Sequence, residues 1–135
     1  MNLAANSPLG PADNSAHGAA SGHDSGVDAS HLADALNLMW QRFLPEIRER
    51  AAILEAAATS LAASQLSSEI CQQANAAAHK LAGTLGTFNL AQGTQLAREF
   101  ETLTAQANPA SIDPNLAGRL KSLSAQIHAI IESRP

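Results

Sequence analysis

The chain has 135 residues, which is enough for one domain with a substantial core. Apolar residues make up 45% of it and aromatic residues only 3%, which favours helices packed through small side chains over a β-rich fold. The net charge is −4, and residues 31–135 carry 8 basic and 9 acidic side chains, so the sequence has no basic stripe for nucleic acid. We therefore expect an all-α domain with protein or small-molecule partners.

Cys71 is the only cysteine, so an internal disulfide is excluded and an intracellular protein is favoured. We interpret Cys71 as a small helix residue with no redox task. No apolar run approaches the roughly 20 residues of a membrane-spanning helix, and the first residues lack the basic and apolar regions of a signal peptide. The sequence thus predicts a cytoplasmic protein that does not associate with a membrane.

Residues 1–30 are rich in Gly, Ser, Ala, Asn and Asp and contain almost no large apolar side chain. Such a segment cannot offset the entropy that is lost on folding, so we predict a disordered tail or linker. His17 and His23 lie within it without a cysteine or carboxylate at metal-ligand spacing. We interpret both histidines as solvated, and no metal site is predicted.

Apolar residues recur at helical spacing from about residue 31 onward. They predict a first amphipathic helix over 31–44 and a second over about 46–63. Pro45 separates the two, because proline lacks the amide proton that a helix interior needs. It either ends or kinks the first helix or occupies the first turn of the second. A serine-rich break then precedes a third helix over about 67–87.

Two further helix starts are marked by capping residues. Asn89, with Gln92 three residues later, has the pattern of a capping box, which predicts that Asn89 caps a helix from 90 to about 107. Asp113 and Pro114 are the predicted N-cap and first residue of the last helix.

Four long amphipathic helices joined by short turns predict an antiparallel up-down four-helix bundle over 31–135. The 31–44 segment is expected as an additional short N-terminal helix packed across one end. The sequence contains no glycine-rich phosphate loop, nucleophile elbow, paired zinc ligands or internal repeat.

His79 stands on a strip of the third helix from which large side chains are absent. At helical spacing the strip consists of small or uncharged polar residues around one imidazole. We expect these residues to form a docking surface: Gln72, Asn75, Ala76, Ala82, Gly83 and Gly86. The opposite face is an ordinary core stripe, made of Leu66, Ile70, Ala74, Ala77, Leu81, Leu85 and Phe88. Glycine in a helix interior costs roughly 1 kcal/mol relative to alanine, so close approach of another molecule explains the two glycines better than stability does.

The segment from Ala78 to Leu90 resembles the signature of histidine-containing phosphotransfer (Hpt) domains. That signature has a histidine followed by an apolar residue at +2, often lysine at +3, glycine at +4, and frequently glycine at +7 and +10. The chain matches it at His79, Leu81, Gly83 and Gly86. It departs from it at Ala82, in place of the lysine, and at Asn89, in place of the last glycine. Asparagine tolerates left-handed backbone angles, so we expect the turn at 89 to be retained.

The resemblance implies a phosphorelay intermediate, a phosphoryl carrier rather than an enzyme with its own ATP site. It implies that His79 accepts a phosphoryl group from a receiver-domain aspartate and passes it to another. The implied partners are receiver domains of response regulators or hybrid histidine kinases, which supply Mg²⁺, so the chain needs no cofactor of its own. We expect a monomer. An exposed, oriented imidazole nitrogen is chemically suited to this transfer.

The missing lysine leaves Lys80 and Arg98 as candidates for stabilising the phosphoryl group. Lys80 is the favoured candidate, because its position next to His79 does not depend on a helix register. Folding the chain back at residues 88–89 brings Arg98 to the level of His79. A surface arginine paired with Glu99 or Glu101 is the plainer interpretation of Arg98.

Two other histidines, His31 and His128, lack such surroundings and are interpreted as structural or solvated. The alternative function is a helical-bundle adaptor without phosphotransfer, which binds a signalling partner through the same face. The presence of His79 argues against the adaptor, and the missing lysine keeps it open.

Overall fold

The computed structural model describes residues 25–111 and 113–134, and all its regular elements are helices. In chain order they are α2 (Ser25–Ala62), α3 (Ser68–Thr87), α4 (Ala91–Gln106) and α5 (Pro114–Ser133). No strand is present in this part of the chain, so the predicted all-α class is confirmed. Residues 40–134 form one compact unit, and residues 25–39 belong to another.

Helix α2 differs from the prediction at two places, its expected start near residue 31 and the expected boundary at Pro45. It begins at Ser25, so the last six residues of the predicted tail are helical, and it continues through Pro45. The prediction of a separate short helix over 31–44 was therefore wrong. Trp40 and Ile47, on either side of the proline, are both buried. Their burial offsets the loss of one backbone hydrogen bond. Residues 1–24, with His17 and His23, lie outside the described residues.

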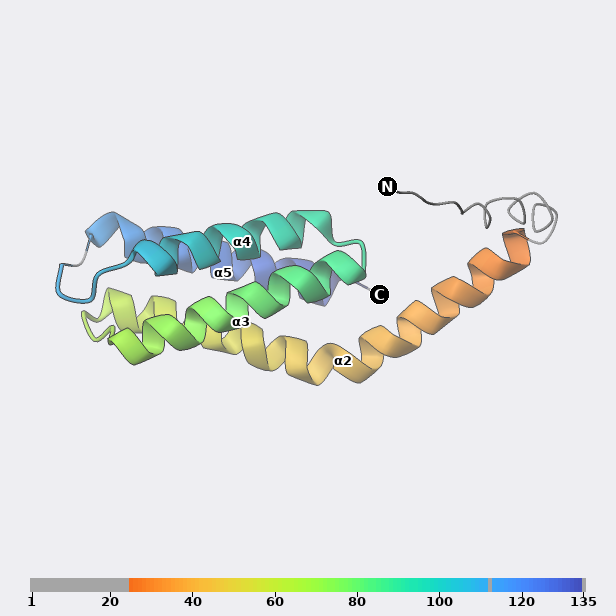
Figure 1. The fold of residues 1–135 in the computed structure, drawn as a ribbon, viewed down its shortest axis with the longest axis horizontal. Coiled ribbons are helices and arrows are strands. Elements are labelled where there is room, and N and C mark those ends of the chain that lie inside the picture. Colours follow the sequence, from red (N-terminus) through yellow and green to blue (C-terminus); the bar gives the residue numbers. More distant parts are fainter. Residues whose placement is uncertain (1–24, 112, 135) are drawn as a thin grey trace, which may run out of the picture. The chain divides into compact units, whose positions relative to one another are not determined.

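Within residues 40–134, the second part of α2 and helices α3, α4 and α5 run alternately in opposite directions (Figure 1). Each helix contributes apolar residues at spacings of three or four to a common core. The largest fully buried side chains are Trp40, Phe100, Ile47, Leu54, Leu81, Leu85, Leu120, Leu123, Ile127 and Ile131. The predicted core stripe of α3 is buried except for Ile70, which is partly exposed.

Side chains cap the first turns of α3 and α5. The Ser67 hydroxyl accepts a hydrogen bond from the Ile70 amide at 3.1 Å. The Asp113 carboxylate accepts one from the Asn115 amide at 2.9 Å, and Pro114 follows it as predicted. Both caps satisfy amides that have no partner inside the helix, which stabilises the helix starts.

Asn89 lies in the turn between α3 and α4 and does not cap α4. Its φ is 62°, in the left-handed region, whereas an N-cap residue needs an extended backbone. The Asn89 amide donates to the Gly86 carbonyl at 3.1 Å, and the Leu90 amide donates to the Leu85 carbonyl at 2.9 Å. This pattern closes the C-terminus of α3 as a Schellman motif. The predicted capping box is therefore wrong, and the expected tolerance of asparagine for left-handed angles is confirmed.

Over the part of the chain that the structure describes, no helix is both long enough and apolar enough to cross a membrane.

Candidate functional site

His79 lies in the middle of α3 and points away from the core. Its side chain is 74% exposed, while Ala78 and Leu81, which flank it on the inner face, are fully buried. The strongly amphipathic spacing of α3 produces this orientation, because burying the apolar stripe turns position 79 outward. The outward direction of His79 is as the sequence predicted.

The imidazole of His79 contacts one carboxylate of α4. The distance from His79 Nδ1 to Glu101 Oε2 is 2.9 Å. An ionised carboxylate only accepts hydrogen bonds, so the proton of this bond resides on Nδ1. The neutral ring then carries its lone pair on Nε2, and no hydrogen bond to Nε2 occurs among the described residues. The pair thus presents a free imidazole nitrogen to solvent.

An open groove of about 600 Å³ lies between α3 and α4 beside His79. Arg98 is part of its wall, but Lys80 is not. Its lining consists of Asn75, His79, Ala82, Gly83, Arg98, Glu101, Thr102, Ala105 and Gln106. The chain reversal at residues 88–89 therefore brings Arg98 near His79, as expected. The residue that reaches the imidazole, however, is Glu101.

Arg98 does not form the ion pairs that the plainer interpretation offered. Glu99 pairs with Arg119 of α5, and Glu101 contacts His79. Among the described residues Arg98 has no salt bridge, and its side chain is exposed. Arg98 thus lines the groove beside His79 without an acidic partner within that part of the chain.

The predicted docking strip is narrower than the sequence indicated. Ala82 is only 4% exposed, and its carbonyl accepts a hydrogen bond from Thr94 Oγ1 at 2.9 Å. Asn75 is partly buried and donates to the Glu101 carbonyl at 2.8 Å. Helix α4 thus covers one edge of the strip, because periodicity shows a face but not how far a neighbouring helix overlaps it. The positions that remain exposed are Gln72, Ala76, Gly83 and Gly86.

The described part of the chain holds no other group with comparable chemistry. Burial raises the pKa of the Cys71 thiol, which makes it less reactive. His128 Nε2 lies 3.6 Å from Glu55 Oε1, and His31 is exposed. No cluster of three or more His, Cys, Asp or Glu side chains suited to a metal occurs within residues 25–111 and 113–134.

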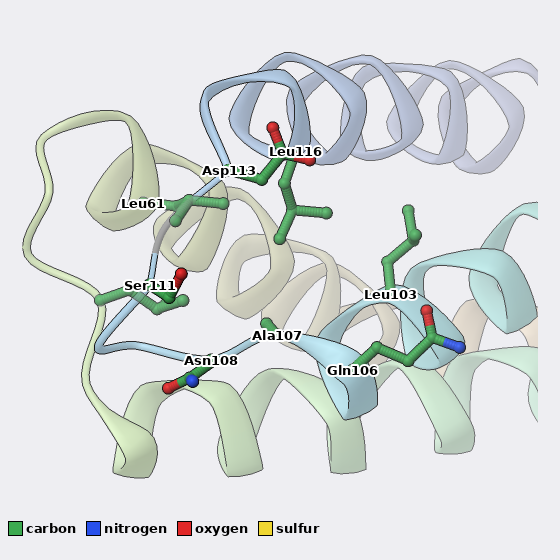
Figure 2. Close-up of a pocket in the computed structure, with 9 residues that line it drawn as sticks. Leu61, Leu103, Gln106, Ala107, Asn108, Ser111, Asp113 and Leu116 are labelled. Atoms are coloured by element: carbon green, nitrogen blue, oxygen red, sulfur yellow. The ribbon is translucent and has the colours of Figure 1, made fainter.

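A second cavity, of about 300 Å³, lies where α2 and α4 end and α5 begins (Figure 2). Asp113 is its only ionisable residue, and its carboxylate already caps α5. The other lining residues are Leu61, Leu66, Leu103, Gln106, Ala107, Asn108, Ser111 and Leu116. The lining of this cavity includes no histidine, cysteine, lysine or arginine, so the groove at His79 is the better candidate site.

Glu101 was expected only as a partner of Arg98, and its contact with His79 was not predicted. The signal available was the antiparallel hairpin of α3 and α4, which puts residues 98–102 at the level of 79. Which of them faces the imidazole depends on the rotation of α4, and this rotation is set by packing.

Comparison with known proteins identifies the family of the chain. A family model described as Hpt domain matches residues 38–131 of the 135. The chain therefore belongs to the Hpt domain family, as its motif indicated. It is 39% identical over 66 residues to Protein RcaC of Microchaete diplosiphon, a match covering 49% of this chain and 10% of RcaC. The match thus spans about a tenth of that relative. No solved structure matches the chain significantly. Hpt domains are histidine phosphotransfer modules of phosphorelays and are not ATP-binding kinases.

Proposed function

We propose that this chain is a phosphorelay intermediate that accepts a phosphoryl group on His79 from a receiver-domain aspartate and passes it to another receiver aspartate. The observation that carries the proposal is the exposed His79 ring, whose Nδ1 is held by Glu101 and whose Nε2 is free. Membership of the Hpt family supports phosphotransfer in general.

The arrangement suits nucleophilic attack by Nε2. The Nε2 lone pair forms the new bond to phosphorus, and the bond between phosphorus and the aspartate oxygen breaks, with its electron pair left on the aspartate. The imidazole becomes positively charged in this step. Because Nδ1–H faces the Glu101 carboxylate at 2.9 Å, the charge is stabilised where it develops. Reversal of the same step returns the phosphoryl group to a receiver.

The exposed strip around His79 supplies the docking surface in this proposal. Gln72, Ala76, Gly83 and Gly86 have short or uncharged side chains, so active-site loops of a receiver can approach the imidazole closely. The receiver, from a response regulator or a hybrid kinase, provides the Mg²⁺. We expect the exchange to take place in the cytoplasm, between a monomer of this chain and one receiver at a time.

Incubation with a ³²P-labelled receiver tests the proposal. We expect acid-labile, alkali-stable label on the wild type and none on His79→Gln, which should melt at nearly the same temperature because the side chain is exposed. A wild-type chain that binds the receiver but takes up no label would instead indicate the adaptor. Undiminished label on His79→Gln would assign the chemistry to another residue.

We further propose that Arg98, rather than Lys80, contacts the phosphoryl oxygens. Arg98 lines the groove beside His79, and Lys80 does not. Charge-assisted hydrogen bonds are worth about 1.5–3 kcal/mol and less at exposed, salt-screened sites. Arg98→Ala should therefore slow transfer several-fold at low salt and less at high salt, while Lys80→Ala serves as the matched control. If both variants transfer at the wild-type rate, the receiver supplies every phosphoryl contact.

A further inference from the structure

Two residues of α3, one helical turn apart, reach the same residue of α4. Asn75 Nδ2 donates to the backbone carbonyl of Glu101 at 2.8 Å, and His79 Nδ1 donates to its side chain at 2.9 Å. Positions 75 and 79 lie on one face of the helix, so the two bonds run side by side between α3 and α4. Glu101 is thus held at its backbone as well as at its carboxylate.

We propose that Asn75 is a positioning residue, which holds Glu101 in place and thereby keeps the proton of His79 on Nδ1. The proposal rests on the proposed function for its consequence, because only a phosphoacceptor needs Nε2 to be the free nitrogen. Asn75 itself does not touch the reacting atoms. It acts on them through the backbone of Glu101 and then through the carboxylate.

Thr104 of α4 takes part in the same group of hydrogen bonds as Asn75 and the Glu101 carbonyl. Its hydroxyl lies 3.0 Å from the carbonyls of both Phe100 and Glu101, which share its one proton, and it accepts a hydrogen bond from Asn75 Nδ2 at 3.3 Å. Thr104 is 5% exposed, and Asn75 is partly buried at the wall of the groove. An isosteric change at Asn75 therefore removes the only hydrogen bond that α3 makes to this carbonyl among the described residues.

The tautomer of His79 is sensitive to small movements of Glu101. N–H···O hydrogen bonds have donor–acceptor distances of about 2.7–3.2 Å and weaken steeply when the angle at the hydrogen falls below about 120°. A shift of the Glu101 backbone by a few tenths of an ångström, or freer rotation of its side chain, would let the imidazole proton move to Nε2. Nε2 would then no longer offer a lone pair.

A second interhelical bond provides a matched control. Thr94 Oγ1 donates to the Ala82 carbonyl at 2.9 Å, and it joins the same two helices through the same kind of side-chain-to-backbone bond. It does not contact Glu101. Loss of this bond loosens the pair of helices without releasing the carboxylate that faces His79.

The test measures the imidazole ¹⁵N chemical shifts of the full chain, with the His79 signals assigned by comparison with His79→Gln. Wild type should show mainly Nδ1–H, and Glu101→Ala defines the state without positioning. We expect Asn75→Leu to lower the ratio of Nδ1–H to Nε2–H by about threefold or more, toward Glu101→Ala, and to slow phosphotransfer in parallel. Thr94→Val should leave the ratio unchanged. Asn75→Leu combined with Glu101→Ala should give no further change.

An unchanged tautomer ratio in a folded Asn75→Leu variant would overturn the proposal. An equal drop in Thr94→Val would also overturn it, because general loosening of the helices would then explain the effect. Thermal unfolding followed by circular dichroism shows whether each variant is folded. The tautomer is measured without any receiver, so absence of phosphotransfer in the wild type would refute the proposed function and leave the positioning result to stand or fall alone.

Discussion

Gly83 and Gly86 look equivalent in the sequence, but their surroundings differ. A Cβ atom added at Gly83 would meet nothing within 4 Å, whereas one at Gly86 would lie 3.3 Å from Thr94 Oγ1. Internal packing therefore gives a partial reason for glycine at 86. It gives none at 83, one turn from His79, where the missing side chain leaves open surface beside the imidazole.

We expect Gly83→Ala to stabilise the protein by about 0.5–1 kcal/mol, because alanine restricts the unfolded chain and favours the helix. Gly83→Leu should keep the fold and slow transfer from a receiver by about tenfold or more, which corresponds to roughly 1.4 kcal/mol of lost complementarity. Urea denaturation and single-turnover transfer rates measure the two effects.

Gly118 in α5 is the matched control, since an added Cβ there also meets nothing within 4 Å. Gly118→Ala should gain similar stability and transfer at the wild-type rate. Transfer by Gly83→Leu at the wild-type rate would show that the surface beside His79 is not part of the docking site.

At the scale of single residues, the sequence predicted the exposure of His79 but not its contact with Glu101. The exposure of His79 follows from the period of one helix. The contact with Glu101 and the burial of Ala82 depend on how α4 is rotated against α3. No pattern within either helix specifies that rotation, because it results from the packing of both surfaces.

The turn between α3 and α4 shows how one residue can end an element. Asn89 has a φ of 62°, and the amides of residues 89 and 90 close the last turn of α3. The N-cap position of α4 is then occupied by Leu90, whose side chain forms no capping hydrogen bond. The turn is therefore stabilised by backbone hydrogen bonds to the last turn of α3 and by the left-handed conformation of Asn89.

We predict that Asn89→Ala destabilises the protein by about 1 kcal/mol, because the left-handed conformation is less favourable for alanine than for asparagine. Asn89→Gly, which restores the family residue, should match or exceed wild-type stability. The free energy of unfolding in urea distinguishes the two. Equal destabilisation by both substitutions would mean that the asparagine side chain, and not its backbone angle, stabilises the turn.

Helix α2 marks the limit of local rules at the scale of elements. The rule that proline breaks a helix predicted a boundary at Pro45, yet the helix is continuous from Ser25 to Ala62. Burial of Trp40 and Ile47 on either side offsets the local penalty. The helices of residues 68–133 were predicted to within a few residues, because apolar periodicity is clear there and side-chain caps mark the starts of α3 and α5.

The ends of the compact unit of residues 40–134 are joined by an ion pair between α2 and α5. Arg48 donates two hydrogen bonds to the Glu132 carboxylate, Nε to Oε2 at 2.9 Å and Nη2 to Oε1 at 2.8 Å. These hydrogen bonds and the charge of Arg48 lower the pKa of Glu132. Both side chains are about half exposed, so salt screens the pair.

This pair predicts a small, pH-dependent contribution to stability. A lowered pKa in the folded state means that the contribution is present above the pKa of the unfolded state, about 4.3, and is lost as the pH falls through the folded value. The melting temperature of wild type should exceed that of Glu132→Gln at pH 7, and the difference should vanish at acidic pH. It should also shrink in high salt.

Glu46→Gln is the control, because the partner of Glu46 is Arg50 of the same helix. This substitution should change the melting temperature less, since the pair of Glu46 and Arg50 does not connect two helices. A difference between wild type and Glu132→Gln that persists unchanged below the folded pKa would rule out the ion pair as its source.

At the opposite extreme from these exposed charges, Trp40 is 1% exposed and lies edge-on to Phe88, with ring centroids 5.2 Å apart. The Arg134 guanidinium carbon is 4.9 Å from the Trp40 ring centroid, so helices α2 and α3 and the end of α5 meet there. The chain has one tryptophan and no tyrosine. Its ultraviolet emission therefore originates from one indole in the core, and a red shift reports opening of this end of the bundle. A variant that transfers slowly with unchanged emission retains the packing of this end of the bundle. Tryptophan emission therefore distinguishes a defect in recognition from a defect in folding, and it needs no added dye.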